Sequence, residues 1–344
     1  MKPILSTCGF EPDLRRIFLA FALLAGVPAS RAGDSAAEQP QIGKAVEAGL
    51  RTLEKSAAIY SEKRACFSCH HQTLPMQAMV IARQHGFKID ENLFRAQARF
   101  THESFRSRAG DLRDGTGIGG KSMTVGYGLW ALHLANWDRD DTTAAMIAYL
   151  LKTQAEDGRF WSNTVRPPLE DSAFTATTIV AYYMQRFLST SDASAAEGAV
   201  AKAKRWLVEN RPKTQEDRNS RFWGLHLLGA DREQIETARV AVQEGQQPDG
   251  GWAQLAEMKS DAYATGQTLF VLRETGMPVD HSVYQRGVRF LLDTQLEDGT
   301  WHVKTRSKPV QTFFDAGFPH DRDQFISVCA TSWAVAALAA AHAR

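Results

Sequence analysis

The chain has 344 residues, of which 44% are apolar and 23% charged, and its 40 Lys and Arg residues nearly balance 39 Asp and Glu residues. This composition excludes an intrinsically disordered, collagen-like or strongly basic protein and is typical of a folded globular one. A formal net charge of +1, without a basic stripe, leaves little to neutralise a phosphate backbone. We therefore expect no nucleic-acid partner.

Residues 1–32 have the features of an export signal. Arg15 and Arg16 precede an apolar run over residues 17–27, and Ser30-Arg31-Ala32 fits a small-x-small cleavage site. The arginine pair is consistent with either the twin-arginine or the general export route. We predict a periplasmic or secreted protein.

The rest of the chain is predicted to be a single domain, residues 41–344, behind a short linker over residues 33–40. After the signal, no apolar run reaches the roughly 20 residues of a membrane span, so no span is expected. Removal of the signal would leave three cysteines, an odd number for an oxidising compartment. A disulfide framework is therefore not expected to hold the fold.

Apolar residues at helical spacing alternate with runs rich in Gly, Ala and Thr along this domain. The pattern predicts six helix pairs, over residues 41–86, 90–136, 141–187, 195–229, 232–276 and 281–342. Three glycines are expected as C-caps of second helices: Gly86, Gly229 and Gly276. Three acids are expected as N-caps of second helices: Asp171, Asp261 and Asp323.

A motif, Q-x-x-D-G-x-[FW], recurs between the two helices of a pair. Its three full copies begin at Gln154, Gln246 and Gln295. A degenerate copy is proposed over residues 215–223, and Asp114-Gly115 marks a further turn. Asp-Gly is a turn signal, and the glutamine and the aromatic ring are expected to serve packing.

These repeats resemble those of squalene and terpene cyclases and of protein prenyltransferases, over most of residues 41–342. The resemblance implies an all-α fold, an α6/α6 toroid with the first helix of each pair in an outer ring and the second in an inner ring. It also implies that the connecting turns gather at the mouth of a central cavity, toward which the inner helices point their positive N-terminal ends. The fold alone does not fix the function.

In the first pair, Cys66-Phe-Ser-Cys69-His70 stands where the other pairs have their turn. C-x-x-C-H is the attachment signature of a c-type haem, in which two thiols add to vinyl groups and the adjacent imidazole ligates the iron. We therefore predict haem attachment at Cys66 and Cys69 and an axial ligand at His70, with Cys329 left as a lone thiol. The alternatives are a Cys66–Cys69 disulfide, a zinc site that lacks a fourth ligand, or no function.

The long sixth turn, from Trp301 to Asp323, is expected to cover the mouth because a closed ring places it beside the first turn. Its basic residues are His302, Lys304, Arg306, Lys308, His320 and Arg322. We predict His320, with His302 nearby, as a distal ligand, and Arg306 or Arg322 as partners of haem propionates. The alternative is that these residues are solvated loop charges.

A cyclase-like or prenyltransferase-like activity without haem is one alternative function. Cyclases of this family that begin by protonating an alkene carry D-x-D-D at the start of an inner helix. Here D-R-D-D over residues 138–141 precedes the outer helix of the third pair, where helix capping explains it better. Asp321 and Asp323 are correctly placed, but Arg322 between them favours the charged carboxylate, the wrong form for a proton donor.

A saccharide- or small-molecule-binding toroid is the other alternative, because tryptophans can stack on sugar rings. The candidates are Trp130, Trp161, Trp252 and Trp301, for which packing is the more frequent role. The sequence favours an exported toroid that binds one covalent haem and acts in electron transfer or redox chemistry. Its partner would be a redox protein or a small molecule in the central cavity.

Overall fold

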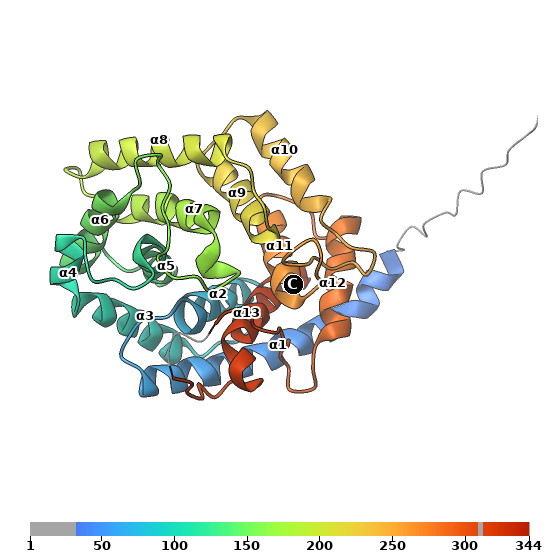
Figure 1. The fold of residues 1–344 in the computed structure, drawn as a ribbon. Coiled ribbons are helices and arrows are strands. Elements are labelled where there is room, and N and C mark those ends of the chain that lie inside the picture. Colours follow the sequence, from blue (N-terminus) through green and yellow to red (C-terminus); the bar gives the residue numbers. More distant parts are fainter. Residues whose placement is uncertain (1–31, 309–311, 344) are drawn as a thin grey trace, which may run out of the picture.

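The computed structural model describes residues 32–308 and 312–343, which form an α/α toroid (Figure 1). The outer ring consists of α1 (Ala32–Lys63), α3 (Glu91–Arg106), α6 (Asp141–Thr153), α8 (Ala193–Glu209), α10 (Arg232–Gln243) and α12 (Ser282–Thr294). The inner ring consists of α2 (Leu74–Gln84), α5 (Lys121–Leu134), α7 (Ala173–Tyr183), α9 (Gln215–Leu227), α11 (Ala262–Glu274) and α13 (Gln324–Ala341). The short elements are η1 (Cys69–Thr73), α4 (Ala109–Asp114), η2 (Leu169–Asp171), η3 (Met184–Phe187) and η4 (Asp321–Asp323). Within the described residues β-pairing is limited to isolated bridges around Trp252.

This architecture confirms the six helix pairs and the toroid predicted from the repeats. The ring closes where α13 lies between α11 and α2, and where α1 packs against α12 and α13. The first and last units therefore cover one another, and neither presents the open end of a solenoid. The structure adds α4, which lies between α3 and α5 and packs against α6.

The beginning of α1 differs from the prediction. Residues 33–40, expected to form a linker, belong to α1. Two contacts hold this end on the last unit: Arg289 Nε donates to Glu38 Oε1 at 2.8 Å, and Gln39 Nε2 donates to Ala341 O at 3.3 Å. The partners lie some 250 to 300 residues away, so local periodicity could not reveal them. The predicted signal peptide, apart from its last residue, lies outside the described residues.

The glutamine of each full motif turn joins two neighbouring units. Its Nε2 donates to the glycine carbonyl of its own turn and to a carbonyl of the next outer helix. The second acceptor is Ala199 in α8 for Gln154 (2.8 Å), Val283 in α12 for Gln246 (2.8 Å) and Ala45 in α1 for Gln295 (2.9 Å). The last of these bonds closes the ring between the sixth and first units.

The glycine and the aromatic residue of the motif also contact the neighbouring helices. Gly299 has φ +82°, and a Cβ there would lie 2.7 Å from the backbone of Ala48 in α1. Trp301 is fully buried, donates from Nε1 to Leu291 O at 2.8 Å, and donates from its backbone N–H to Thr331 Oγ1 at 3.2 Å. The fifth unit repeats both kinds of tryptophan contact. The prediction that the motif serves turn formation and packing is confirmed.

Aromatic side chains of five inner helices fill the centre of the ring. The Trp130 ring on α5 lies 5.1 Å from Tyr183, 5.4 Å from Trp223 and 6.2 Å from Trp333, centroid to centroid. Phe270 of α11 lies 5.5 Å from Trp223 and 5.0 Å from Trp333. This apolar core holds the inner helices together independently of what binds at their N-terminal ends.

The ends of the inner helices largely follow the predicted caps. All three predicted C-cap glycines have positive φ, between 62° and 99°. Asp261 caps α11 by accepting from Ala264 N at 2.9 Å. In α7, however, the N-cap is Ser172, which follows Asp171, and it accepts from Thr175 N at 3.1 Å.

The proposed degenerate motif over residues 215–223 was wrong, because these residues lie inside α9. Thr214 and Asp217 form a capping box at the start of this helix, with Asp217 N donating to Thr214 Oγ1 at 3.1 Å. Asp and Thr are common both in turns and at helix N-caps, so the residue types alone do not distinguish a turn from a helix start.

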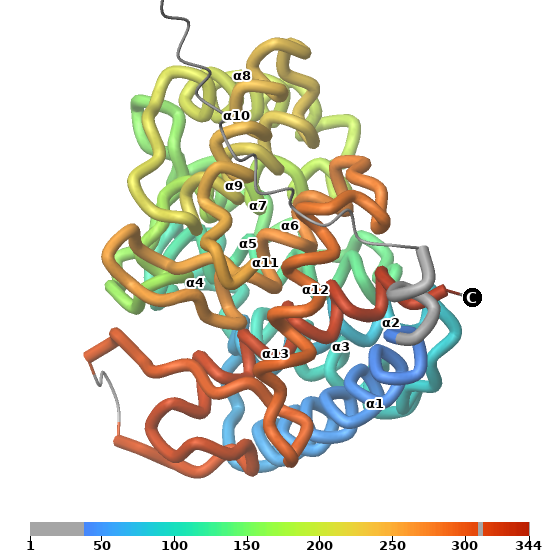
Figure 2. The backbone as a smooth tube through the Cα atoms, turned by 90° about the vertical axis from the view of Figure 1, so that its right-hand side faces the viewer, coloured from blue at the N-terminus to red at the C-terminus, as the bar shows by residue number. Residues whose placement is uncertain are grey.

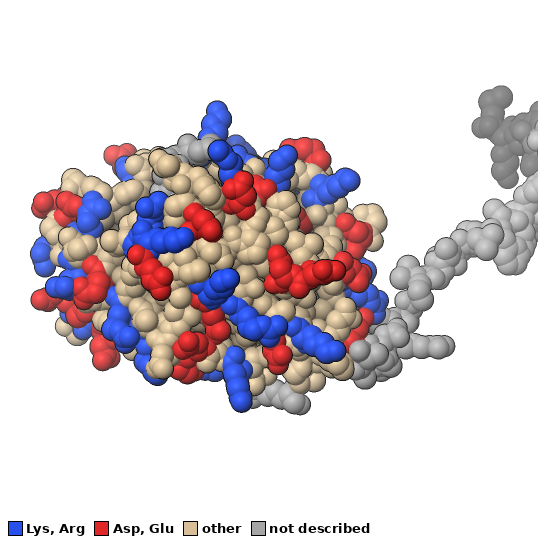
Figure 3. All heavy atoms as spheres, turned by 90° about the horizontal axis from the view of Figure 1, so that it is seen from below, with Lys and Arg blue, Asp and Glu red and all other residues tan. Residues whose placement is uncertain are grey.

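The last inner helix is long and apolar enough to cross a membrane, over Asp321–Ala341, and it is the one such helix among the described residues. Because 89% of its most apolar window is buried inside the protein, α13 serves as a core helix of the toroid. On the face drawn in Figure 3, Lys and Arg side chains are interspersed with Asp and Glu.

Candidate functional site

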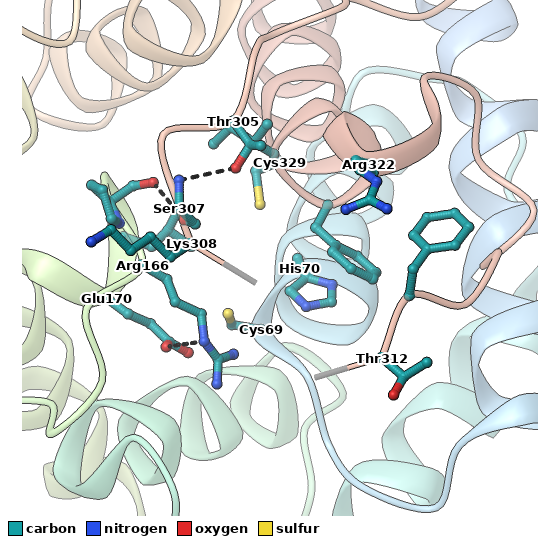
Figure 4. Close-up of a pocket in the computed structure, with 15 residues that line it drawn as sticks. Cys69, His70, Arg166, Glu170, Thr305, Ser307, Lys308, Thr312, Arg322 and Cys329 are labelled. Carbon is teal, nitrogen blue, oxygen red and sulfur yellow. Dashed lines mark hydrogen bonds and ion pairs between the residues drawn. The ribbon is translucent and has the colours of Figure 1, made fainter. Parts of the chain in front are cut away.

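A cavity of about 480 Å³ lies at the N-terminal ends of inner helices, within the size range of small-molecule sites. Its walls come from η1, the loop before α7, and the long loop and first turns leading into α13 (Figure 4). Figure 2 shows that this long loop lies at one end of the ring and the C-terminus at the other. The described lining residues are Cys69, His70, Arg166, Pro167, Leu169, Glu170, Thr305, Ser307, Lys308, Thr312, Phe313, Arg322, Phe325, Ile326 and Cys329.

A π-helical turn, η1, precedes the first inner helix and carries the second half of the cysteine motif. Leu74 N–H bonds to Cys69 O, which closes the wider turn. Pro75 follows, and its nitrogen has no hydrogen to continue the α-helical bonding pattern. In this turn the Nδ1 atoms of the consecutive residues His70 and His71 meet in a hydrogen bond. Turns of this kind are frequent at functional sites, and the sequence pattern did not predict this one.

The three cysteines of the described chain are free thiols in two kinds of surroundings. Cys69 and Cys329 are buried, and their sulfurs point into the same space of the cavity in Figure 4. Burial raises the pKa of both thiols. Cys66 is exposed, lies outside the cavity lining, and has its Sγ 3.8 Å from the Tyr60 hydroxyl. Of the two motif thiols, therefore, Cys69 faces the cavity and Cys66 lies at the protein surface.

His70 connects the cavity to a buried polar chain. His71 Nε2 lies 3.0 Å from Ser56 Oγ, and this hydroxyl donates to Ala316 O at 2.8 Å. Burial lowers the pKa of His70 to about 3, with the charge of Arg166 adding to the effect. Burial also lowers the pKa of His71 well below its usual value. Both rings are therefore neutral near pH 7, the form in which an imidazole can bind a metal.

Basic side chains stand on the cavity wall. Arg166 and Arg322 both line it, and Arg166 Nε lies 3.3 Å from Glu170 Oε2. Arg306, predicted together with Arg322 as a partner of propionates, instead donates from Nε to Gln254 Oε1 at 2.9 Å. The structure therefore brings Arg322 to the cavity with Cys69 and His70 but leaves Arg306 outside the lining.

The two histidines of the sixth turn also lie outside the cavity lining. His320 Nε2 is 2.8 Å from Thr300 Oγ1, and the rings of His302 and His320 stack with centroids 4.7 Å apart. The structure does not bring His320 to the cavity that His70 lines.

The acids of the sixth turn are engaged away from the cavity. Asp323 Oδ1 accepts from Thr305 N at 2.8 Å, and Asp323 Oδ2 lies 2.8 Å from His302 Nε2. Asp321 is exposed and does not line the cavity.

The other sequence-predicted candidates have structural roles. Within the 138–141 segment, Asp140 caps α6 by accepting from Thr142 N (3.0 Å) and Thr143 N (2.9 Å), as predicted. None of the four candidate tryptophans lines the cavity, and three of them are fully buried. Lys121 lies 4.0 Å above the ring of the fourth, Trp161. In the described part of the chain, no three His, Cys, Asp or Glu side chains are grouped to hold a metal ion.

A buried carboxyl that the sequence analysis did not single out is Glu216, near the start of α9. It accepts from Thr175 Oγ1 on α7 at 2.6 Å, and from Tyr263 OH (2.9 Å) and Gln267 Nε2 (2.8 Å) on α11. Burial raises the pKa of Glu216 to about 7, although these three donors act in the opposite direction. In the sequence, one feature could have indicated Glu216: it lies near the start of an inner helix, and the toroid resemblance places these helix ends at the mouth of the cavity.

No protein-family model and no curated protein matches the chain. Among solved structures, a wild-type glycosidase is similar with a TM-score of 0.58 at 12% identity, over 90% of this chain and 98% of that one. The type II terpene cyclase MstE from Scytonema gives a TM-score of 0.51 at 14% identity, over 87% and 98%. An ent-copalyl diphosphate synthase from Streptomyces platensis gives 0.50 at 16%, over 78% of this chain and 50% of that one. At these identities the likeness concerns the fold, which this chain shares with terpene cyclases and glycosidases of the α/α-toroid type.

Proposed function

We propose that this protein is an exported toroid with one covalent haem at its mouth, attached through Cys66 and Cys69 and ligated by His70, and that it acts in electron transfer or redox chemistry. The observation that carries the proposal is that Cys69 and His70, consecutive in C-x-x-C-H, line the same cavity at the inner-helix N-termini. Haem attachment through this motif needs a thiol and the following imidazole at the same macrocycle.

The chemistry of the cavity supports a haem. His70 is neutral and able to ligate a metal through a ring nitrogen. The apolar side chains of Phe325 and Ile326 suit the macrocycle, and Arg166 and Arg322 suit its carboxylates. A bound haem would supply one-electron redox chemistry. The contribution of the chain is to bury the ligand, exclude water from one wall and hold the anionic edge.

Attachment through Cys66 depends on the irregular segment over residues 64–68. Phe67 N donates to Ser104 Oγ at 2.8 Å, which ties this segment to α3. Ser68 N donates to Gln72 Oε1 at 2.9 Å, which ties it to η1. Cys66 precedes these two anchors and is exposed, so the proposal requires Cys66 to turn from the surface toward the cavity when haem is attached.

The two alternative functions receive less support from the cavity. Glycoside hydrolysis generally uses two carboxyl groups that flank the scissile bond. Glu170 is the single carboxyl among the described lining residues, and it is paired with Arg166. Protonation of an alkene needs an acid that faces the cavity, whereas Asp323 lies outside the lining and is hydrogen-bonded to His302 and Thr305 of its own turn.

The test is expression of the full chain in a periplasm that contains haem-maturation machinery. We expect a red protein whose pigment resists acid extraction and stays with the polypeptide on a denaturing gel, with a mass increase of one haem. Colourless wild-type protein, or pigment that acid extraction removes, would overturn the proposal.

Two variants identify the attachment residues. Cys66→Ala together with Cys69→Ala should abolish the covalent pigment. Cys329→Ala is the matched control, because Cys329 also lines the cavity but lies outside the motif, and this variant should keep its haem. A double variant that still carries covalent haem would contradict the assignment.

A further inference from the structure

The ring of His70 begins a chain of hydrogen bonds that leads away from the cavity into the protein. His70 Nδ1 bonds to His71 Nδ1, His71 Nε2 lies 3.0 Å from Ser56 Oγ, and Ser56 Oγ lies 2.8 Å from Ala316 O. The chain joins η1, α1 and the loop before α13. Ser56, His71 and Ala316 are fully buried, so water does not compete for these contacts.

The carbonyl of Ala316, at the end of this series of hydrogen bonds, determines which atom donates in each bond. A carbonyl oxygen can only accept, so Ser56 must donate its one hydroxyl hydrogen to Ala316 O. The Ser56 oxygen then accepts from His71, which must carry its hydrogen on Nε2. A neutral His71 with hydrogen on Nε2 presents a bare Nδ1, and His70 must therefore donate from Nδ1.

These bond directions determine whether the other ring nitrogen of His70, Nε2, carries a hydrogen. With its hydrogen on Nδ1, the neutral ring of His70 keeps an unprotonated Nε2. Aromatic neighbours hold both rings in this arrangement: Tyr60 stacks on His71 with centroids 4.7 Å apart, and Phe325 packs on His70 at 4.8 Å. His70 lines the cavity, whereas His71 is fully buried behind it.

We propose that His71 and Ser56 are positioning residues that hold His70 in its Nδ1–H tautomer and so keep the Nε2 lone pair available to a ligand in the cavity. The tautomer follows from the hydrogen bonds of the chain alone, whereas the identity of the ligand as haem iron rests on the proposed function. A ligand imidazole that donates from its other nitrogen is better oriented and more basic.

The tautomer can be measured without haem. In full-length protein carrying Cys66→Ala and Cys69→Ala and ¹⁵N-labelled histidine, long-range ¹H–¹⁵N spectra distinguish the two ring nitrogens. We expect His70 protonated on Nδ1 and His71 on Nε2, assigned through His70→Gln and His71→Gln. His70 found with its hydrogen on Nε2, or exchanging between tautomers, would overturn the inference whatever binds in the cavity.

A second measurement uses the haem-loaded protein. His71→Leu should keep covalent haem but raise its reduction potential, because the ligand loses its hydrogen-bond acceptor and becomes less basic. Ser56→Ala should shift the potential in the same direction but less, because His71 stays beside His70 while its own tautomer is no longer fixed. His71→Gln, which retains a donor and an acceptor, should restore part of the shift. Thr52→Val is the control, because Thr52 lies on the same helix but bonds to the carbonyls of Ala48 and Asp298 and takes no part in the hydrogen bonds from His70 to Ala316.

The outcomes separate the two proposals. Wild-type protein without covalent haem contradicts the proposed function but leaves the tautomer measurement standing. Haem-loaded wild-type protein whose potential is unchanged by Ser56→Ala contradicts the positioning role and leaves the proposed function intact. Should His71→Leu fail to fold, Ser56→Ala carries the measurement, since it removes a single oxygen.

Discussion

The turn over residues 295–301 and the turn over residues 66–73 occupy the same place in the sixth and first helix pairs, each between an outer and an inner helix. In the sixth unit, Gln295 donates across to α1 and Gly299 lies against its backbone. In the first unit, Gln72 still donates across to the next outer helix, to Gln97 Oε1 at 3.1 Å, but a thiol and an imidazole line the cavity instead. The glutamine bridge between units is thus separable from the rest of the motif, which leaves the first turn free to carry chemistry.

The largest effect is expected from a substitution that disrupts the packing of a motif turn. Gly299→Ala should lower the free energy of unfolding by about 3 kcal/mol, because it adds left-handed backbone strain to an overlap with the backbone of Ala48. Gly276→Ala is the control: its φ of +99° carries similar strain, but nothing lies within 4 Å of the added Cβ. Its cost should be nearer 1 kcal/mol. Equal losses in urea denaturation would show that contact with α1 contributes nothing.

A second effect concerns a buried polar group at the N-terminal end of an inner helix outside the first turn. The raised pKa of Glu216, about 7, means that the native state holds a proton that the unfolded chain has released. The contribution of this proton to the free energy of unfolding is fully present below the pKa that Glu216 has in the unfolded chain, and it is lost as the pH rises through 7. The total change is about 3 kcal/mol.

Glu216→Gln removes this titration. Between pH 5 and pH 8 the stability of the variant, measured by urea denaturation, should therefore fall less steeply than that of wild type. Identical slopes for wild type and Glu216→Gln would mean that Glu216 is already ionised at pH 5.

The fold was predictable because several units repeat the same signals along the chain. Three copies of one motif, helical periodicity and glycines after inner helices gave the six pairs without reference to distant contacts. Residues 33–40 were predicted as a linker, and their helix was missed because it is held by the opposite end of the chain. The segment over residues 215–223 was misassigned because a capping box uses the same residue types as a turn.

The candidate site was predictable only in part. The motif located Cys69 and His70, since C-x-x-C-H is local in sequence. Arg166 and Glu170 come from the loop before α7, and no local pattern links that loop to the first turn. The hydrogen bond from His71 toward Ser56 joins residues 15 positions apart through a π-helical turn, which helical periodicity does not anticipate.

Removing one of the glutamine side chains that join neighbouring units should have a smaller effect on stability. Gln295→Leu leaves the carbonyls of Ala45 and Gly299 without this donor and should cost about 2 kcal/mol in urea denaturation. Gln154→Leu removes the same pair of bonds within the ring and should cost about as much. A much larger loss for Gln295→Leu would mean that ring closure contributes stability beyond these two hydrogen bonds.

The smallest expected effect concerns the first thiol. Cys66 is exposed and contacts the Tyr60 hydroxyl at 3.8 Å, so Cys66→Ser should change the stability of haem-free protein by less than about 0.5 kcal/mol. Cys69→Ser places a hydroxyl where a buried thiol lies and should cost about 1 to 2 kcal/mol. Both are measurable by thermal denaturation under reducing conditions. A large loss for Cys66→Ser would mean that this thiol supports the fold, as the motif turns do, and would remove the reason to treat the first turn as the one free to carry chemistry.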